Sequence, residues 1–151
     1  MSALPDGMER NMTVIQLSVF VENQPGKLAE ITNQLKNLNI DIRALSVADT
    51  ESFGVLRLIV DHPNRASASL RESGFNVTLT EVIAIGVSDS PGGLAAALNV
   101  LADASIVVEN MYPFVSRTKD MAYVILRTNN NGSAIDALKK ADIKILTGEE
   151  I

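Results

Sequence analysis

The alternation of apolar and polar residues in the N-terminal half of the chain predicts strands separated by helices. Residues 14–21 carry an apolar side chain at every second position, which is typical of a half-buried strand. After a short break the period becomes helical, and one apolar stripe is formed by Leu28, Ile31, Leu35 and Leu38. Further strands are predicted at residues 40–48, 53–61 and 75–82, with a second helix from Pro63 to Gly74.

The same order of elements recurs in the C-terminal half. Strands are predicted at residues 82–87, 106–114, 121–128 and 143–147, and helices are marked by Leu94, Leu98, Leu101, Ile135 and Leu138. Gly26 and Gly92 are 66 positions apart, as are Asn39 and Ser105, whereas Leu70 and Leu138 are 68 apart. An offset that changes only at a hairpin indicates duplication, because loop tips tolerate insertions.

This repeat predicts an α+β protein made of two tandem ferredoxin-like βαββαβ modules. Each module is expected to form an antiparallel sheet with both helices on one face. The predicted boundaries are a disordered lead-in at residues 1–12, a first domain at 13–81 and a second at 82–151. The other sheet face and the edge strand need to be covered, either by the sister module or by another molecule.

Composition narrows the class of protein. Hydrophobic residues make up 46% of the chain and charged residues 21%, as in ordinary globular proteins. No apolar run reaches the roughly 20 residues that span a bilayer, so no membrane partner is expected. The absence of cysteine fits a cytoplasmic location. A net charge of −5 without a basic run argues against a nucleic-acid partner.

Candidate catalytic groups are few. The single histidine, His62, follows a predicted strand and is expected to be solvated. Without cysteine or a Gly-x-Ser-x-Gly motif, neither a reactive thiol nor a serine triad can form. No metal-ligand spacing and no glycine-rich cofactor motif is present. The sequence therefore predicts no enzyme activity, no metal and no cofactor, although an enzyme on a ferredoxin-like scaffold stays a less favoured alternative.

The break between the first strand and the first helix is the motif that repeats most clearly. It reads Asn23-Gln24-Pro25-Gly26 in one half and Asp89-Ser90-Pro91-Gly92 in the other. One interpretation is structural, because Asn, Asp and Ser cap helices, proline suits the first helical turn and glycine makes the turn tight. The other is functional, because a helix N-terminus presents N–H groups that suit a carboxylate, and glycine allows close approach. Both interpretations stay open.

With these motifs the chain resembles the ACT domain family in two copies, over residues 14–147. The resemblance rests on a strand, the [Asn/Asp]-x-Pro-Gly break, a leucine-rich helix and Asn39-Ile40 at the start of the second strand. It implies a regulatory module that binds an amino acid at an interface between modules. There, the Pro-Gly loop of one module faces the start of the second strand of another.

Carried over by position, the resemblance implies two sets of ligand-binding residues. The first copy offers Asn23, Gln24, Pro25, Gly26, Lys27 and Leu28, with Asn39, Ile40 and Asp41. The second copy offers Asp89, Ser90, Pro91, Gly92, Gly93 and Leu94, with Ser105 and Ile106. The copies differ, because Ser105 is shorter than Asn39 and Asp89 would repel a ligand carboxylate. Where some members of the family have a histidine, this chain has Val21 and Val87.

The resulting expectation is a non-catalytic, cytoplasmic amino-acid sensor that forms a homodimer and regulates a partner enzyme or regulator. Apolar residues near the expected pockets favour an apolar amino acid as the ligand. One alternative is a protein–protein interaction subunit whose ligand pockets are vestigial. A second alternative, RNA binding through the open sheet face, lacks the aromatic and basic residues that it would need.

Overall fold

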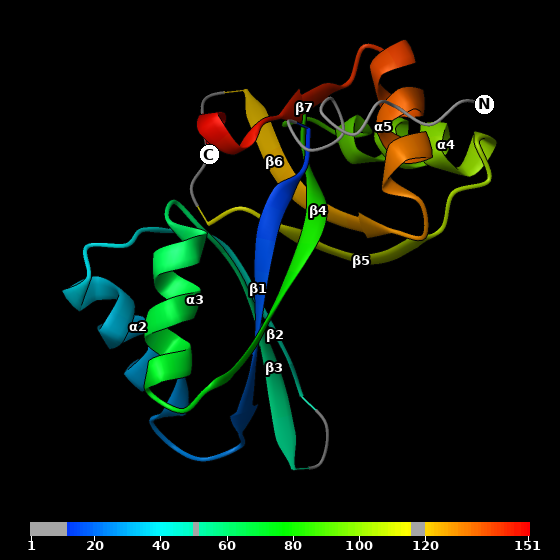
Figure 1. The fold of residues 1–151 in the computed structure, drawn as a ribbon. Helices are drawn as coiled ribbons and strands as arrows, with labels where there is room; N and C mark the ends of the chain where they lie inside the picture. Colours follow the sequence, from blue (N-terminus) through cyan, green and yellow to red (C-terminus); the bar gives the residue numbers. More distant parts are fainter. Residues whose placement is uncertain (1–11, 50–51, 116–119) are drawn as a thin grey trace. The chain divides into compact units, whose positions relative to one another are not determined.

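The computed structural model describes residues 12–49, 52–115 and 120–151, and the chain divides into two compact units. We call Ile15–Thr80 the N-terminal module, and residues 12–14 with Glu81–Ile151 the C-terminal module. The elements, labelled in Figure 1, are β1 (Val14–Glu22), α2 (Lys27–Asn37), β2 (Ile42–Asp49), β3 (Phe53–Val60), α3 (Pro63–Glu72), β4 (Asn76–Ser88), α4 (Gly93–Asp103), β5 (Val108–Pro113), β6 (Met121–Thr128), α5 (Asn131–Lys140) and β7 (Lys144–Leu146), followed by a short 3-10 turn at Gly148–Glu150. The predicted lead-in lies outside the described residues, apart from Met12.

Both modules have the strand order of a ferredoxin-like fold. The order is β2-β3-β1-β4 in the N-terminal module, and in the C-terminal module β5-β6-β4 is followed by β7, which pairs with β4. The pairs β1–β3, β2–β3, β4–β6, β5–β6 and β4–β7 are antiparallel. The predicted α+β class is therefore confirmed. One detail was wrong, because β4 is a single strand where the sequence suggested two strands meeting near Val82.

The core of the N-terminal module lies between the helices and one face of the sheet. Alternate residues of β1, such as Leu17 and Val19, are fully buried against Ile31 and Leu35 of α2. Leu28 was predicted to belong to the same stripe, but its exposed fraction is 40%. Leu28 lies in the first turn of α2, outside the buried cluster. The apolar stripe on this helix therefore extends past the end of the core.

The core of the C-terminal module repeats this arrangement. Ile83 and Ile85 of β4 pack in one cluster with Leu101 of α4 and Leu138 of α5, and Met12 lies against the same cluster. Leu94, like Leu28, was predicted to be internal and instead is 36% exposed. The same departure at both equivalent positions indicates a shared feature of the two modules rather than a local accident.

The α-helices α2, α3, α4 and α5 all end in the same hydrogen-bonded turn. After α2, the N–H of Ile40 donates to the carbonyl of Leu35 (2.9 Å) and that of Asn39 donates to Lys36 (3.0 Å). This Schellman pattern needs one residue with positive φ, which glycine and asparagine tolerate best. The residues in that position are Asn39 (φ 57°), Gly74 (93°), Ser105 (59°) and Asp142 (57°). The turn aims the chain from each helix into the next strand.

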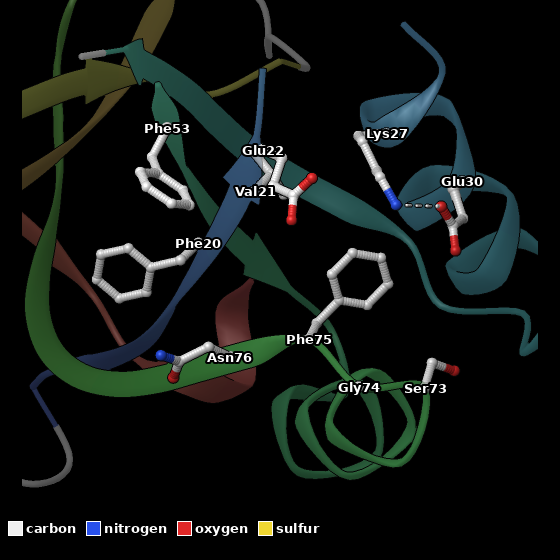
Figure 2. A pocket seen from close by; sticks show the side chains of 10 residues that line it. All are labelled: Phe20, Val21, Glu22, Lys27, Glu30, Phe53, Ser73, Gly74, Phe75 and Asn76. Atoms are coloured by element: carbon white, nitrogen blue, oxygen red, sulfur yellow. Dashed lines mark ion pairs between the residues drawn. The ribbon is translucent and has the colours of Figure 1, made fainter. Parts of the chain in front are cut away.

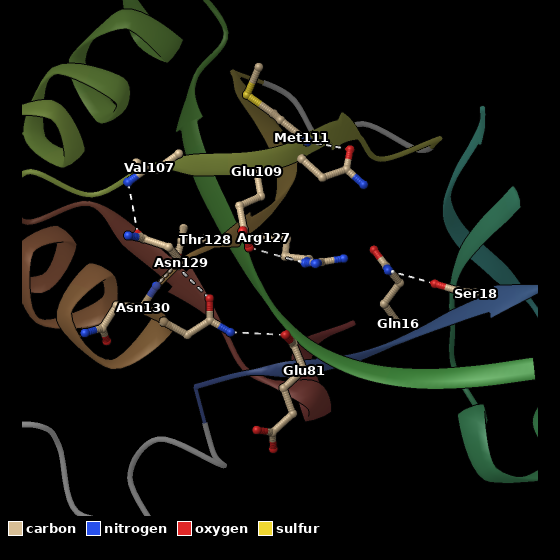
Figure 3. A network of polar contacts seen from close by, with 12 residues as sticks. Gln16, Ser18, Glu81, Val107, Glu109, Met111, Arg127, Thr128, Asn129 and Asn130 are labelled. Atoms are coloured by element: carbon tan, nitrogen blue, oxygen red, sulfur yellow. Dashed lines mark hydrogen bonds and ion pairs between the residues drawn. The ribbon is translucent and has the colours of Figure 1, made fainter. Parts of the chain in front are cut away.

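A repeated tie fixes the start of the second strand in each module. In the N-terminal module, the backbone N–H of Asp41 donates to Oδ1 of Asp61 at 2.9 Å. In the C-terminal module, the N–H of Val107 donates to Oδ1 of Asn129 at 3.0 Å, as Figure 3 shows. Two residues further on, the side chain of Asn131 accepts a hydrogen bond from the Thr128 hydroxyl and donates one to the Glu81 carbonyl. These hydrogen bonds explain why both modules have a polar residue, Asp61 or Asn129, at the end of the third strand.

Candidate functional site

The loop before each first helix is shaped by a glycine with positive φ. Gly26 (φ 88°) precedes the first residue of α2, and Gly92 (φ 89°) precedes that of α4. Neither helix has a side-chain cap at this position, and Pro25 lies outside the helix. The structural interpretation of the motif was therefore wrong for the side-chain cap and for the proline, whereas its third part, a glycine that makes the turn, is confirmed in both loops.

The space above these glycines is open. A Cβ built on Gly26 or Gly92 would have no atom within 4 Å. Glycine is therefore required by its backbone conformation and not by crowding. The backbone N–H of Gln24 already donates to the backbone carbonyl of Glu22 at 2.8 Å. The first amide of α2, that of Lys27, donates to the carbonyl of Gln24 at 3.4 Å. A carboxylate that approaches over Gly26 would therefore meet the next amides of the first turn, which have no intrahelical acceptor.

The second group of predicted residues lies at the start of β2. Asn39, Ile40 and Asp41 line a shallow hollow of about 440 Å³ together with Thr32 and Lys36. Asp41 pairs with Arg43. Asn39 was expected to stop the first helix, and its positive φ in the turn after α2 confirms this structural role, which stands in addition to any contact with a ligand.

The two groups do not meet within one module. The loop at 23–26 precedes α2 and Asn39 follows it, and α2 has 11 residues. At a rise of about 1.5 Å per residue, the two ends lie on the order of 15 Å apart. In the C-terminal module, Ser105 and Ile106 are separated from the loop at 89–92 by α4 in the same way. A single amino acid is too short to bridge either pair.

The two loops differ at the first helical residue. Gly93 packs so tightly that a Cβ there would lie 2.0 Å from the carbonyl oxygen of Ser88. Its equivalent, Lys27, has a full side chain, whose Nζ lies 3.7 Å from Oε2 of Glu30. The N-terminal loop therefore offers a cation where the C-terminal loop offers none.

Sequence reasoning missed a pocket of about 320 Å³ in the N-terminal module. Figure 2 shows its wall, which includes Phe20, Phe53 and Phe75 as well as Lys27. Of these residues only Lys27 belonged to the predicted site. A signal was present in the sequence, because three of the chain's four phenylalanines fall in this module.

Neither a membrane-spanning helix nor a cluster of metal ligands occurs in the described part of the chain. Among its helices, none has the length and apolar character needed to cross a bilayer. Within the same residues, acidic, histidine and cysteine side chains nowhere gather in threes as a metal site would require.

Comparison with known proteins places the chain in a family. A family model described as an ACT domain pair matches residues 12–151. A crystal structure of a protein from Bacteroides thetaiotaomicron is 34% identical, covers 92% of this chain and 95% of its own, and superposes with a TM-score of 0.87. The chain therefore belongs to the ACT domain pair family.

More distant structures share the fold. The regulatory subunit of aspartate kinase from Thermus thermophilus is 17% identical, with 86% of this chain and 93% of that chain covered and a TM-score of 0.62. The corresponding subunit from Thermus flavus is 14% identical, with 85% and 92% covered and a TM-score of 0.58. A comparison with curated proteins found no match.

Proposed function

We propose that this protein is a non-catalytic regulator that binds a free amino acid at an interface between ACT modules. The observation that carries the proposal is the separation of the two predicted groups by the full length of α2. A ligand that contacts both a Pro-Gly loop and the start of a second strand must therefore lie between two modules.

Three features support this proposal. The approach over Gly26 and Gly92 is open. Leu28 and Leu94, which follow these glycines, are 40% and 36% exposed and offer apolar contacts beside the loop. The neighbouring structures named as regulatory subunits of aspartate kinase share the fold. The absence of cysteine from the sequence agrees with action in the cytoplasm.

The modules that form the interface are expected to come from a homodimer. The edge strand β2 carries Leu45 and Val47 with exposed fractions of 37% and 50%, and Met111 of β5 is 40% exposed. Exposed apolar edge strands are pairing sites, and a two-fold axis would join equivalent surfaces. Ligand binding would change the contact with a partner enzyme or regulator by no more than its differential affinity for the two states.

The same exposed edges favour a second candidate, an interaction subunit whose pockets no longer bind a ligand. Isothermal titration of the common amino acids into the wild type and into Gly26→Val and Gly92→Val separates the two functions. Both variants place a β-branched residue at positive φ, with a similar cost of about 1–2 kcal/mol in stability. We expect at least one of them to lose binding while the folded protein persists. Unchanged affinity in both variants would show that the loops do not form the site.

A further inference from the structure

The pocket in the N-terminal module has an aromatic wall that the fold does not require. Phe20 and Phe53 expose 45% and 54% of their surface, and both line the pocket with Phe75. In Figure 2 the rings of Phe20 and Phe53 lie on the same side of β1. Exposed aromatic rings that gather in a concave surface indicate a binding site more often than scattered apolar residues do.

The opposite wall of the pocket is charged. Lys27 and Glu30 form an exposed ion pair, and Glu22 lies between this pair and the two rings of Phe20 and Phe53 in the view of Figure 2. One cation beside carboxylates, facing an apolar wall, complements a zwitterion with an apolar side chain. Lys27 can bind a carboxylate, and Glu22 can bind an ammonium group.

The C-terminal module supplies a natural comparison. The pairing of Glu22 with Phe53 corresponds to the pairing of Ser88 with Met121, so Met121 is the equivalent of Phe53. The equivalent of Phe20 is Gly86.

The space beside that glycine is already occupied. A Cβ on Gly86 would lie 2.9 Å from Cε of Met121 and 3.1 Å from Cε1 of Tyr123. Gly93 replaces Lys27, so the charged wall is lost as well. The combination of charges and aromatic rings is therefore specific to the N-terminal module.

We propose that this pocket binds a free α-amino acid with an aromatic or large aliphatic side chain, in the N-terminal module only. Lys27 binds the α-carboxylate, Glu22 binds the α-ammonium group, and the phenylalanines surround the side chain. The assignment rests on the proposed function. Lys27 directly follows Gly26 of the Pro-Gly loop, so the pocket is the part of the interface site that the N-terminal module supplies, and the assignment adds which of the two modules holds the ligand. A volume of about 320 Å³ falls within the range of small-molecule sites.

The test is isothermal titration of glycine, alanine, leucine and phenylalanine into the full chain. Affinity should rise with side-chain size, by about fourfold for each further buried methylene group, with one ligand per chain. Phe53→Ser and Lys27→Met should each weaken binding on the order of tenfold or more. Met121→Ser, the equivalent change in the C-terminal module, should leave affinity unchanged.

The possible failures are distinguishable. If the wild type binds an amino acid and both Phe53→Ser and Lys27→Met retain its affinity, the pocket assignment is overturned and the proposed function stands. If the wild type binds none of the amino acids, both are overturned. Light scattering on Phe53→Ser completes the test. Weaker binding at unchanged mass supports the pocket, whereas weaker binding together with dissociation would assign Phe53 to assembly and overturn it.

Discussion

Gly93 lies so close to Ser88 that a Cβ on Gly93 would stand 2.0 Å from the carbonyl oxygen of Ser88. No real Cβ tolerates that distance to a backbone atom, so α4 can begin where it does only because residue 93 is glycine. The equivalent residue of the N-terminal module is Lys27, which has a full side chain. The duplicated modules therefore differ in backbone packing at the loop where the family resemblance places a ligand.

This contact predicts a large stability difference between two glycines. Gly93→Ala should lower the free energy of unfolding by about 1–3 kcal/mol, because the methyl group forces the backbone apart. Gly148→Ala is the matched control, since a Cβ on Gly148 would meet no atom within 4 Å. Urea unfolding of both variants measures the effect. Equal stabilities would mean that α4 shifts without cost and that the contact does not distinguish the modules.

Asn39 offers a way to separate a structural role from a ligand contact. Its φ of 57° favours glycine, so Asn39→Gly should retain stability to within about 1 kcal/mol, whereas Asn39→Val should lose about 1–2 kcal/mol. If the amide of Asn39 also binds ligand, Asn39→Gly should weaken binding even though the fold is intact. Chemical denaturation and titration of the two variants test both points. If Asn39→Gly binds the ligand with wild-type affinity, the role of Asn39 is limited to the turn after α2.

Gln34 is predicted to hold the two helices of the N-terminal module together. Its Nε2 lies within hydrogen-bond distance of the carbonyl of Ser69 (2.9 Å) and of the hydroxyls of Ser69 (2.7 Å) and Ser73 (2.9 Å). Gln34→Ala should therefore lower the unfolding free energy by about 0.5–1.5 kcal/mol. Thermal unfolding checks this, with the exposed Gln24→Ala as a control. No difference between them would show that solvent replaces these bonds at no cost.

The expected assembly is a homodimer, which contains four ACT modules. Light scattering after size exclusion should give twice the chain mass of 16.2 kDa. Val47→Lys, on the edge strand β2, should shift the protein toward monomer because it places a charge on an apolar edge. A monomeric wild type at micromolar concentration would contradict the expected dimer. The ligand could then not bind at an interface between two chains.

The periodicity of the apolar residues and the internal repeat of the two modules were sufficient to predict the fold from the sequence. Alternation at residues 14–21 and helical spacing from Ile31 to Leu35 depend on local geometry. The offset of 66 positions, which becomes 68 after the second hairpin, relates each element to its counterpart. The two misplaced leucines, Leu28 and Leu94, show the limit of this reasoning. A helical period does not reveal where the core ends, because that depends on the strands beneath the helix.

The candidate site was predictable only in part. Gly26 follows from its motif, since a repeated Pro-Gly break before a helix predicts a turn that needs glycine. The pocket beside Phe20 and Phe53 could not be found this way, because it gathers residues from β1, β3, α2 and β4. The tight packing of Gly93 was equally hidden, since it depends on the distance between two backbone segments and not on residue type.

Amino-acid binding by the folded protein is tested most simply by a thermal-shift panel of the common amino acids at millimolar concentration. A ligand that binds only the folded state raises the melting temperature by mass action. We predict a rise for a small group of apolar amino acids and none for glycine, with the rise reduced by Gly26→Val. A flat response to every amino acid would contradict the account and favour an interaction subunit without a ligand.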